Sequence, residues 1–528
     1  MTEAQSVLLA IGVAIVAILL TALGRRLPIP TAILQVLGGL VVGLVPGARE
    51  FRVSPELVFF VFLPPVIWSA AFFTSFRDFK ANLRPIGLLA IGLVAVTTVV
   101  VALVAHRLFP GMPWPAAVAL GAIVSPPDAV AAEAVLKRLA IPRRVTSILL
   151  GESLVNDASA LILYRGAVGA LIGGLFSPGE LIVRFFVDAA VGVLVGLLVG
   201  WLIVQAAKHT DDPLAETALT LLGPYLAWIG GEYLHVSAVL ACVAGGIYVR
   251  QHFSTIVAPA SRIQSRAVWD LFLFGLNSLV FLLLGAEFSD LLSAVPAATL
   301  LTVGGTGLLI AGIVIVVRLV WVPLAAFIPR WLDAALRARD PMPGAPVLFV
   351  ISWTGMRGIV SLATALALPL STAEGTPTPF RATLILVTVI VILVTLVLQG
   401  LTLMPLFRRL PLPEDRAASV EERHARTEAR RAALEHLEDV ADEPWVRREE
   451  LERVASDVRT AAAHHPGEDG AEGAGTLRRL RLGTVAARRR ALVRLRDEGA
   501  ISDEVLLDLE SELDYEALRL GAGNAREA

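Results

Sequence analysis

Thirteen apolar stretches divide most of this chain into segments long enough to cross a lipid bilayer. A membrane-spanning helix needs about 20 consecutive, mostly apolar residues. The stretches lie near residues 5–23, 31–46, 55–74, 85–108, 114–136, 145–173, 181–206, 214–231, 235–250, 267–287, 297–328, 347–370 and 381–407. We therefore predict an all-α polytopic membrane protein with about 13 transmembrane helices.

The charge distribution separates this membrane part from a soluble tail. Only 17% of the residues are charged, against about 25% in a soluble globular domain, which argues against a soluble enzyme. Residues 1–410 carry six more basic than acidic side chains, and residues 411–528 carry eight more acidic than basic ones. We predict a transmembrane domain over 1–410 and a small cytoplasmic, helical, regulatory or assembly domain over 411–528.

The tail shows no sign of a catalytic module. Helices with mixed charge are expected over 421–437, 444–463, 480–498 and 502–520. Neither part of the chain has the basic face with interleaved aromatic residues that nucleic acid requires. Cys242 is the only cysteine, which excludes an internal disulfide and a cysteine-based metal site. No cofactor is expected.

Basic residues between the stretches predict the topology. The first stretch follows an acidic start and precedes Arg25 and Arg26, which is typical of a spanning helix with its N-terminus outside, not of a cleaved leader. With this orientation, the inner loops hold sixteen lysines and arginines and the outer loops hold four, in agreement with the positive-inside rule. We expect a multi-pass plasma-membrane protein with a cytoplasmic C-terminus.

The number of spans and two interrupted spans indicate a transporter. Thirteen spans divide into two groups of six joined by one linker helix, which gives two repeats of opposite orientation, as in secondary transporters. The fifth and twelfth spans then correspond, and both contain helix breakers, at residues 125–128 and 353–358. Proline removes a backbone donor, and glycine weakens a helix. Broken, crossing helices at corresponding positions indicate a binding site at the membrane midplane.

Five ionisable side chains lie clearly within the predicted spans: Asp128, Glu152, Asp157, Arg318 and Arg357. Each costs about 2.5–3.5 kcal/mol at mid-bilayer, so each needs a role. We assign Glu152 to the arginines, which leaves Asp157 unpaired. A buried carboxylate without a partner can hold a proton near neutral pH. A group that binds either a proton or a cation, never both, is the minimum chemistry of a proton/cation exchanger.

Helical spacing predicts how the polar residues of the sixth span are grouped. Glu152 and Asn156 are four residues apart and share one face, and Ser153 and Asp157 share the adjacent face. The second pair joins Asp128 and the carbonyl groups freed beside the proline pair in a set of oxygen ligands. Such a set suits hard cations, not zinc or copper.

Structural roles remain open for several of these residues. A fold-holding ion pair is favoured over a transport role for Glu152 and Arg357. Asp128 could cap the half-helix that follows the break, and Asn156 could join two helices. For Asp157 a functional role is favoured, because no nearby sequence element offers it a partner.

Six short segments, in order along the spans, carry a resemblance to a known family. They are Phe62–Pro65, Ser125–Val130, Gly151–Asp157, Trp269–Asp270 with Asn277, Phe281–Gly285 and Trp353–Ser361. In these segments the chain resembles the cation/proton antiporter family, specifically the Asn-Asp branch of bacterial sodium/proton exchangers. The resemblance covers nearly all of residues 5–410.

The resemblance implies a homodimer whose scaffold and mobile core move relative to each other. It implies a cation- and proton-binding site of Asp157, Asp128, Ser153 and Asn156, with Na⁺ at Asp157, Ser153 and Asp128 and with the backbone near Pro127 as a further ligand. It also implies a supporting network of Glu152, Arg318, Arg357 and Asn156, in which Glu152 forms an ion bridge with both arginines. No catalytic residue is implied, and the protein is predicted not to be an enzyme.

Two positions depart from the family pattern. Many members carry an acid after the third-span proline pair, where this chain has Ser69. The usual Thr of the fifth-span break is Pro127, so that only its carbonyl could bind an ion. Both departures leave selectivity among Na⁺, Li⁺ and K⁺ open.

The leading prediction is electroneutral exchange of Na⁺ or Li⁺ for H⁺ across the bilayer by alternating access. A K⁺/H⁺ antiporter on the same scaffold is the alternative. A cation channel lined by Asp128 and Asp157 is less favoured, because channels use rings of carbonyls or acids from several subunits. A receptor with a signalling tail is also less favoured, since residues 411–528 show no recognisable ligand module.

Overall fold

The computed structural model confirms the predicted all-α class. It describes residues 3–27, 29–44, 55–128, 141–173, 178–210, 212–256, 259–294, 297–372, 374–411, 427, 431–443, 446–460, 512–513 and 515–516. Within these ranges the regular secondary structure is helical, apart from an isolated bridge between Ser371 and Pro377. The chain divides into two compact units, Met1–Asp415 and Arg416–Ala528.

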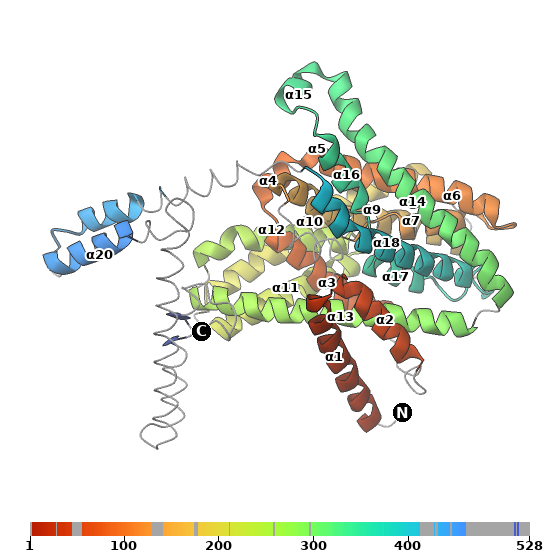
Figure 1. The fold of residues 1–528 in the computed structure, drawn as a ribbon, viewed down its shortest axis with the longest axis horizontal. Helices are drawn as coiled ribbons and strands as arrows, with labels where there is room; N and C mark the ends of the chain where they lie inside the picture. Colours follow the sequence, from red (N-terminus) through yellow and green to blue (C-terminus); the bar gives the residue numbers. More distant parts are fainter. Residues whose placement is uncertain are drawn as a thin grey trace. The chain divides into compact units, whose positions relative to one another are not determined.

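The helices of the first unit follow the predicted apolar stretches in order (Figure 1). They are α1 (Glu3–Arg26), α2 (Thr31–Gly43), α3 (Pro55–Phe73), α4 (Phe76–Ala81), α5 (Leu83–Gly87), η2 (Leu88–Leu93), α6 (Val94–Leu108), α7 (Trp114–Val124), α9 (Arg143–Gly173), α10 (Pro178–Ala207), α11 (Pro213–Tyr233), α12 (Ala238–Ile256), α13 (Pro259–Ala294), α14 (Ala297–Leu332), α15 (Ala334–Arg339), α16 (Ala345–Trp353), α17 (Ile359–Leu366) and α18 (Arg381–Arg409).

Length and composition identify several of these helices as membrane-spanning. Within the described residues, six helical segments are long and apolar enough to cross a bilayer: Leu83–Leu108, Arg143–Gly173, Val183–Ala207, Ser261–Phe288, Thr302–Leu332 and Arg381–Arg409. Shorter apolar helices cover Ile11–Gly24, Thr31–Gly43, Phe60–Phe73 and Trp114–Val124. The pattern is that of a multi-pass membrane protein in which some spans are interrupted.

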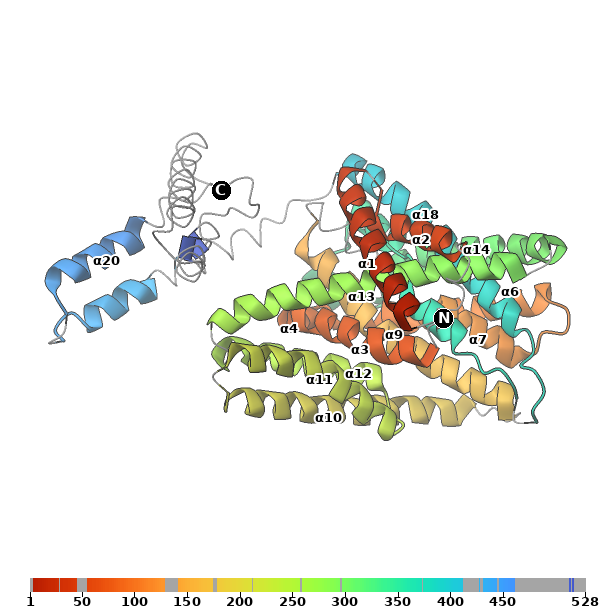
Figure 2. The same cartoon turned by 90° about the horizontal axis from the view of Figure 1, so that it is seen from below.

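Two clusters of buried apolar side chains hold the first unit together. One cluster joins α2, α6, α7, α14, α16, α17 and α18, and the other joins α3, α10, α11 and α12. Figure 2 shows α10, α11 and α12 as neighbouring helices of the second group. Three helices contribute to both clusters: α9, α13 and α17. In α9, Ile148 and Tyr164 lie in the first cluster and Leu154 and Leu161 in the second, so the polar motif of α9 lies where the two clusters meet.

Most of the described residues of the second unit are helical. Helix α20 (Arg448–Thr460) lies within the predicted segment 444–463, and residues 431–439 overlap the segment predicted over 421–437. The helix predicted over 480–498 lies outside the described residues. Of the segment 502–520, only residues 512–513 and 515–516 are described, and these are helical.

Candidate functional site

The two broken spans meet at their breaks. Helix α7 ends at Val124, directly before the proline pair, and residues 125–128 are not helical. A second non-helical stretch, residues 354–358, separates α16 from α17. The Asp128 N–H donates to the Met356 carbonyl at 2.7 Å, which joins one break to the other. The segment after Asp128 that this residue could cap lies outside the described residues.

The close contact between the two breaks requires a glycine at position 358. The carboxylate of Asp128 packs against Gly358, so closely that a Cβ at residue 358 would overlap it. Gly358 is also the N-cap residue of α17. The Asp128 carboxylate therefore lies at the amino end of a helix, where the helix dipole favours negative charge.

A buried ion pair joins α9 to α14 beside this crossing. Glu152 is 1% exposed, and its carboxylate oxygens accept hydrogen bonds from Nη1 and Nη2 of Arg318 at 2.5 and 2.8 Å. Arg318 is fully buried and also donates to the Ile351 carbonyl near the end of α16. Since this pair is bidentate and the arginine has a further acceptor, the buried charges are well compensated.

Arg357 is equally buried but has a different set of partners. Its guanidinium donates to the carbonyl of Gly355, to that of Val124 at 3.0 Å and to that of Ser125 at 3.4 Å. The resemblance implied that Glu152 would bridge both arginines, whereas the hydrogen bonds of Glu152 go to Arg318. The physical reason is that the two unwound stretches supply carbonyl groups that no helix uses.

Asn156 connects α9 to the first break. Its side chain is fully buried, and Nδ2 donates to the Pro127 carbonyl at 3.1 Å. Within the part of the chain that the structure describes, its Oδ1 atom has no hydrogen-bond partner. Asn156 thus fixes the position of the proline pair relative to the helix that carries Asp157.

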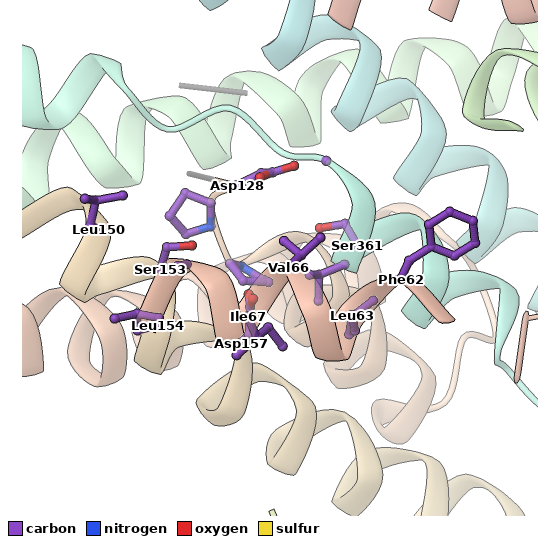
Figure 3. A pocket seen from close by; sticks show the side chains of 15 residues that line it. Phe62, Leu63, Val66, Ile67, Asp128, Leu150, Ser153, Leu154, Asp157 and Ser361 are labelled. Atoms are coloured by element: carbon purple, nitrogen blue, oxygen red, sulfur yellow. The ribbon is translucent and has the colours of Figure 1, made fainter. Parts of the chain in front are cut away.

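Asp157 and Ser153 line a cavity of about 50 Å³, together with Asp128 and Ser361 (Figure 3). A water molecule needs about 10–15 Å³ of such space, so the cavity has room for a small ion with some water. Asp157 is 7% exposed and, among the described residues, makes no hydrogen bond or ion pair. The opposite wall is apolar and comes from α3: Phe62, Leu63, Val66, Ile67 and Ala70.

The sequence analysis did not single out Ser361 as a site residue. Its Oγ atom is buried and has no hydrogen-bond partner among the described residues, and the residue lines the cavity. A buried hydroxyl without a partner costs about 1–3 kcal/mol, which a ligand in the cavity would offset. The sequence did contain one indication of this role: Ser361 is a hydroxyl residue about one helical turn after the break at Gly358.

Ser69, the departure noted on the third span, does not line the cavity. Its Oγ donates to the Val66 carbonyl of its own helix at 2.9 Å, and the side chain is buried. The residues that α3 contributes to the cavity are apolar. The carbonyl of Pro127, the second departure, accepts the bond from Asn156 and retains one lone pair.

The break between α16 and α17 contacts the non-helical residues that follow α7, beside a buried carboxylate and within a multi-pass helical bundle, which is typical of a secondary transporter. Residues 12–409 match the model of the sodium/hydrogen exchanger, transmembrane family, and the chain belongs to that family. The predicted family is therefore confirmed, and with it the assignment as a membrane antiporter of the Na⁺/H⁺ exchange type.

Relatives and one solved structure agree with this assignment. The chain is 36% identical over 515 residues to an uncharacterized Na⁺/H⁺ exchanger of Mycobacterium tuberculosis, covering 95% of this chain and 93% of that protein. It is 32% identical over 430 residues to a sodium, potassium, lithium and rubidium/H⁺ antiporter of Bacillus pumilus, covering 79% and 63%. The fold is similar to that of a sodium proton antiporter of Methanocaldococcus jannaschii, with a TM-score of 0.58 at 20% identity, covering 75% and 99% of the two chains.

Proposed function

We propose that this protein exchanges Na⁺ or Li⁺ for H⁺ by alternating access, and that cation and proton compete for Asp157. The observation that carries the proposal is the position of Asp157: it is buried, has no partner among the described residues and faces a cavity. An isolated charge in apolar surroundings is very costly. The carboxylate must therefore bind a proton or a cation at each stage of the cycle.

The cavity offers an oxygen-only set of ligands for the cation. The carboxylates of Asp157 and Asp128 and the hydroxyls of Ser153 and Ser361 line it, and the remaining lone pair of the Pro127 carbonyl completes the set. Ligands of this type suit hard monovalent cations. The ion pair of Glu152 and the hydrogen bond from Asn156 to the Pro127 carbonyl hold this set in place.

The proposed cycle moves the helices that carry the polar ligands relative to α3. The polar ligands come from α9, α17 and the first break, whereas the apolar wall comes from α3 of the second cluster. This movement would carry Asp157 along the apolar wall and expose Asp157 to one side of the membrane at a time. We place the N-terminus outside and the C-terminal domain in the cytoplasm, and expect two copies to associate in the bilayer.

The test is cation-driven proton flux through the purified protein in liposomes, repeated with Na⁺, Li⁺ and K⁺. We expect saturable exchange that depends on the pH gradient and on Na⁺ or Li⁺. A flux with K⁺ as strong as that with Na⁺ would favour the K⁺/H⁺ alternative, in line with the substrates in the name of the Bacillus pumilus relative. Cation flux without any coupled proton flux would contradict the proposal.

Ser361→Ala is expected to weaken cation binding without abolishing exchange. The variant removes one uncharged ligand worth about 1 kcal/mol, which corresponds to about a fivefold rise in the half-saturating Na⁺ concentration. The matched control is Ser352→Ala, because Ser352 is a buried hydroxyl on α16 that donates to the Leu348 carbonyl and does not line the cavity. Equal Na⁺ dependence of the two variants would remove Ser361 from the site.

Exchange is expected to be insensitive to membrane potential. One exchangeable carboxylate, Asp157, carries either one proton or one monovalent cation, so that a full cycle moves no net charge. An electrogenic cycle would instead respond to about 2.3 kcal/mol per charge per 100 mV. Liposomes clamped with valinomycin at different potentials and a fixed pH gradient test this with Na⁺ as substrate. If the point of zero flux shifts with voltage, Asp128 carries a second proton.

A further inference from the structure

A second cavity, of about 260 Å³, lies between α5, α9, α14 and α16, and it shares no lining residue with the ion site. Three arginines line it: Arg84, Arg144 and Arg330. Much of the remaining wall is apolar and includes Leu89, Val145, Ile148, Val322, Leu348 and Ile351. An apolar cavity with three guanidinium groups matches a molecule that has an anionic group and a hydrophobic part.

The three arginines share a single carboxylate. Oxygens of Asp340 lie 2.7 Å from Arg84, 2.9 Å from Arg144 and 2.8 Å from Arg330. Burial acts to raise the pKa of Asp340, but its hydrogen bond to Arg144 and the charges of Arg144, Arg330 and Arg84 hold that pKa below its usual value. Asp340 therefore remains ionised at neutral pH, and this group of four side chains has a net charge of about +2.

The cluster also keeps unused hydrogen-bond donors. A guanidinium carries five N–H groups. In the described contacts, Arg84 uses one donor nitrogen on Asp340, and Arg144 uses one on Asp340 and one on Asn82. Arg330, whose side chain is only 8% exposed, uses all three nitrogens. Arg84 and Arg144 can thus bind a further anion and keep their ion pairs with Asp340.

The neighbouring surface of α14 is suited to contact lipid. Leu324, Phe327 and Ile328 are 41%, 53% and 45% exposed, and the adjacent Ala325 and Ala326 line the cavity. Exposed apolar side chains on a spanning helix face the acyl chains of the bilayer. Since packed protein interiors leave few voids larger than a water molecule, a cavity of this size beside the bilayer is expected to hold a chain of methylene groups.

We propose that this cavity binds one anionic phospholipid, with the phosphate on Arg84 and Arg144 and part of an acyl chain along the apolar wall. Guanidinium groups bind phosphate through paired, charge-assisted hydrogen bonds. Basic pockets between membrane helices on the cytoplasmic side bind anionic headgroups, and our topology places this cluster on that side. The apolar wall selects a lipid over free phosphate.

The test measures the lipid retained by the full-length purified protein after delipidation and reloading with phosphatidylglycerol or with phosphatidylcholine of the same chains. Wild type is expected to retain phosphatidylglycerol preferentially. In Arg84→Gln/Arg144→Gln, each lost charge is expected to weaken that binding about fivefold. Arg337→Gln/Arg339→Gln is the matched control, since both arginines are exposed on α15 and line no part of the cavity. The control is expected to bind like wild type.

Two further variants keep the test decisive if the double arginine variant does not fold. Ala325→Leu fills part of the cavity and leaves the arginines intact, so phosphatidylglycerol binding is expected to weaken. Asp340→Asn removes the competing carboxylate and is expected to strengthen the binding several-fold. An ion cluster with only a structural role would gain no affinity from Asp340→Asn.

Three results would overturn the proposal. The first is equal phosphatidylglycerol retention in the two double arginine variants, and the second is equal retention of phosphatidylcholine and phosphatidylglycerol by wild type. The third is binding of inorganic phosphate as tight as that of phosphatidylglycerol, which would define a site for free anions. None of these readouts depends on transport, so they are independent of the proposed exchange activity.

Discussion

Asp157→Asn is expected to abolish cation/proton exchange and to leave a folded, membrane-inserted protein. Asparagine has nearly the same shape as aspartate, but it cannot release a proton and offers no charge to a cation. Because Asp157 makes no ion pair or hydrogen bond among the described residues, the fold loses little by the change. Proton flux in liposomes and thermal unfolding in detergent measure the two effects separately.

The matched control for this variant is Asp188→Asn. Asp188 lies on α10, where its carboxylate is 3.7 Å from the exposed Arg184, and it does not line the cavity. Exchange by this control is expected to stay near the wild-type rate, because Asp188 lies outside the cavity and its ion pair is with an exposed arginine. Exchange near the wild-type rate in Asp157→Asn would remove Asp157 from the mechanism.

Glu152→Gln is expected to cause a large loss of stability. The amide leaves Arg318 buried without a counter-charge, and removing one partner of a buried ion pair typically costs about 3–5 kcal/mol of the free energy of unfolding. The loss should exceed that of Asp157→Asn, measured as the shift in unfolding temperature in the same detergent. Glu232→Gln is the matched control, since the pair of Glu232 and Arg165 is nearly half exposed, and we expect a loss of at most about 1 kcal/mol.

The opposite pattern would reverse the assignment of the two carboxylates. If Glu152→Gln unfolds like wild type but does not exchange ions, Glu152 is part of the transport site. If Asp157→Asn is then the unstable variant, Asp157 has the structural role.

Local rules explain why much of the fold and of the site could be predicted. Apolar runs predict spanning helices, and the proline pair after Ser125 and the glycines on both sides of Arg357 predict where two of them break. The assignment of Glu152 to the two arginines followed from counting buried charges, and the structure pairs it with one of them, Arg318. These inferences succeed because the bilayer makes each charge and each break costly.

The remaining features depend on tertiary contacts that no local pattern contains. Ser361 becomes a candidate ligand only because α17 directs it into the cavity that Asp157 lines. Arg357 takes its acceptors from Val124 and Ser125, more than 200 positions earlier in the chain. Likewise, Asp340 forms ion pairs with Arg84 on α5 and Arg144 on α9, which lie far from it in the sequence. Such pairings follow from the arrangement of helices, which the sequence does not specify residue by residue.

The competition between cation and proton at Asp157 can be measured directly as proton release on Na⁺ binding. Purified protein in a weakly buffered solution with a pH indicator is titrated with Na⁺, and bound Na⁺ is measured in parallel. Starting from the protonated protein, we expect one proton released for each Na⁺ bound and no release from Asp157→Asn. Na⁺ binding to wild type without proton release, or equal release from Asp157→Asn, would contradict the account.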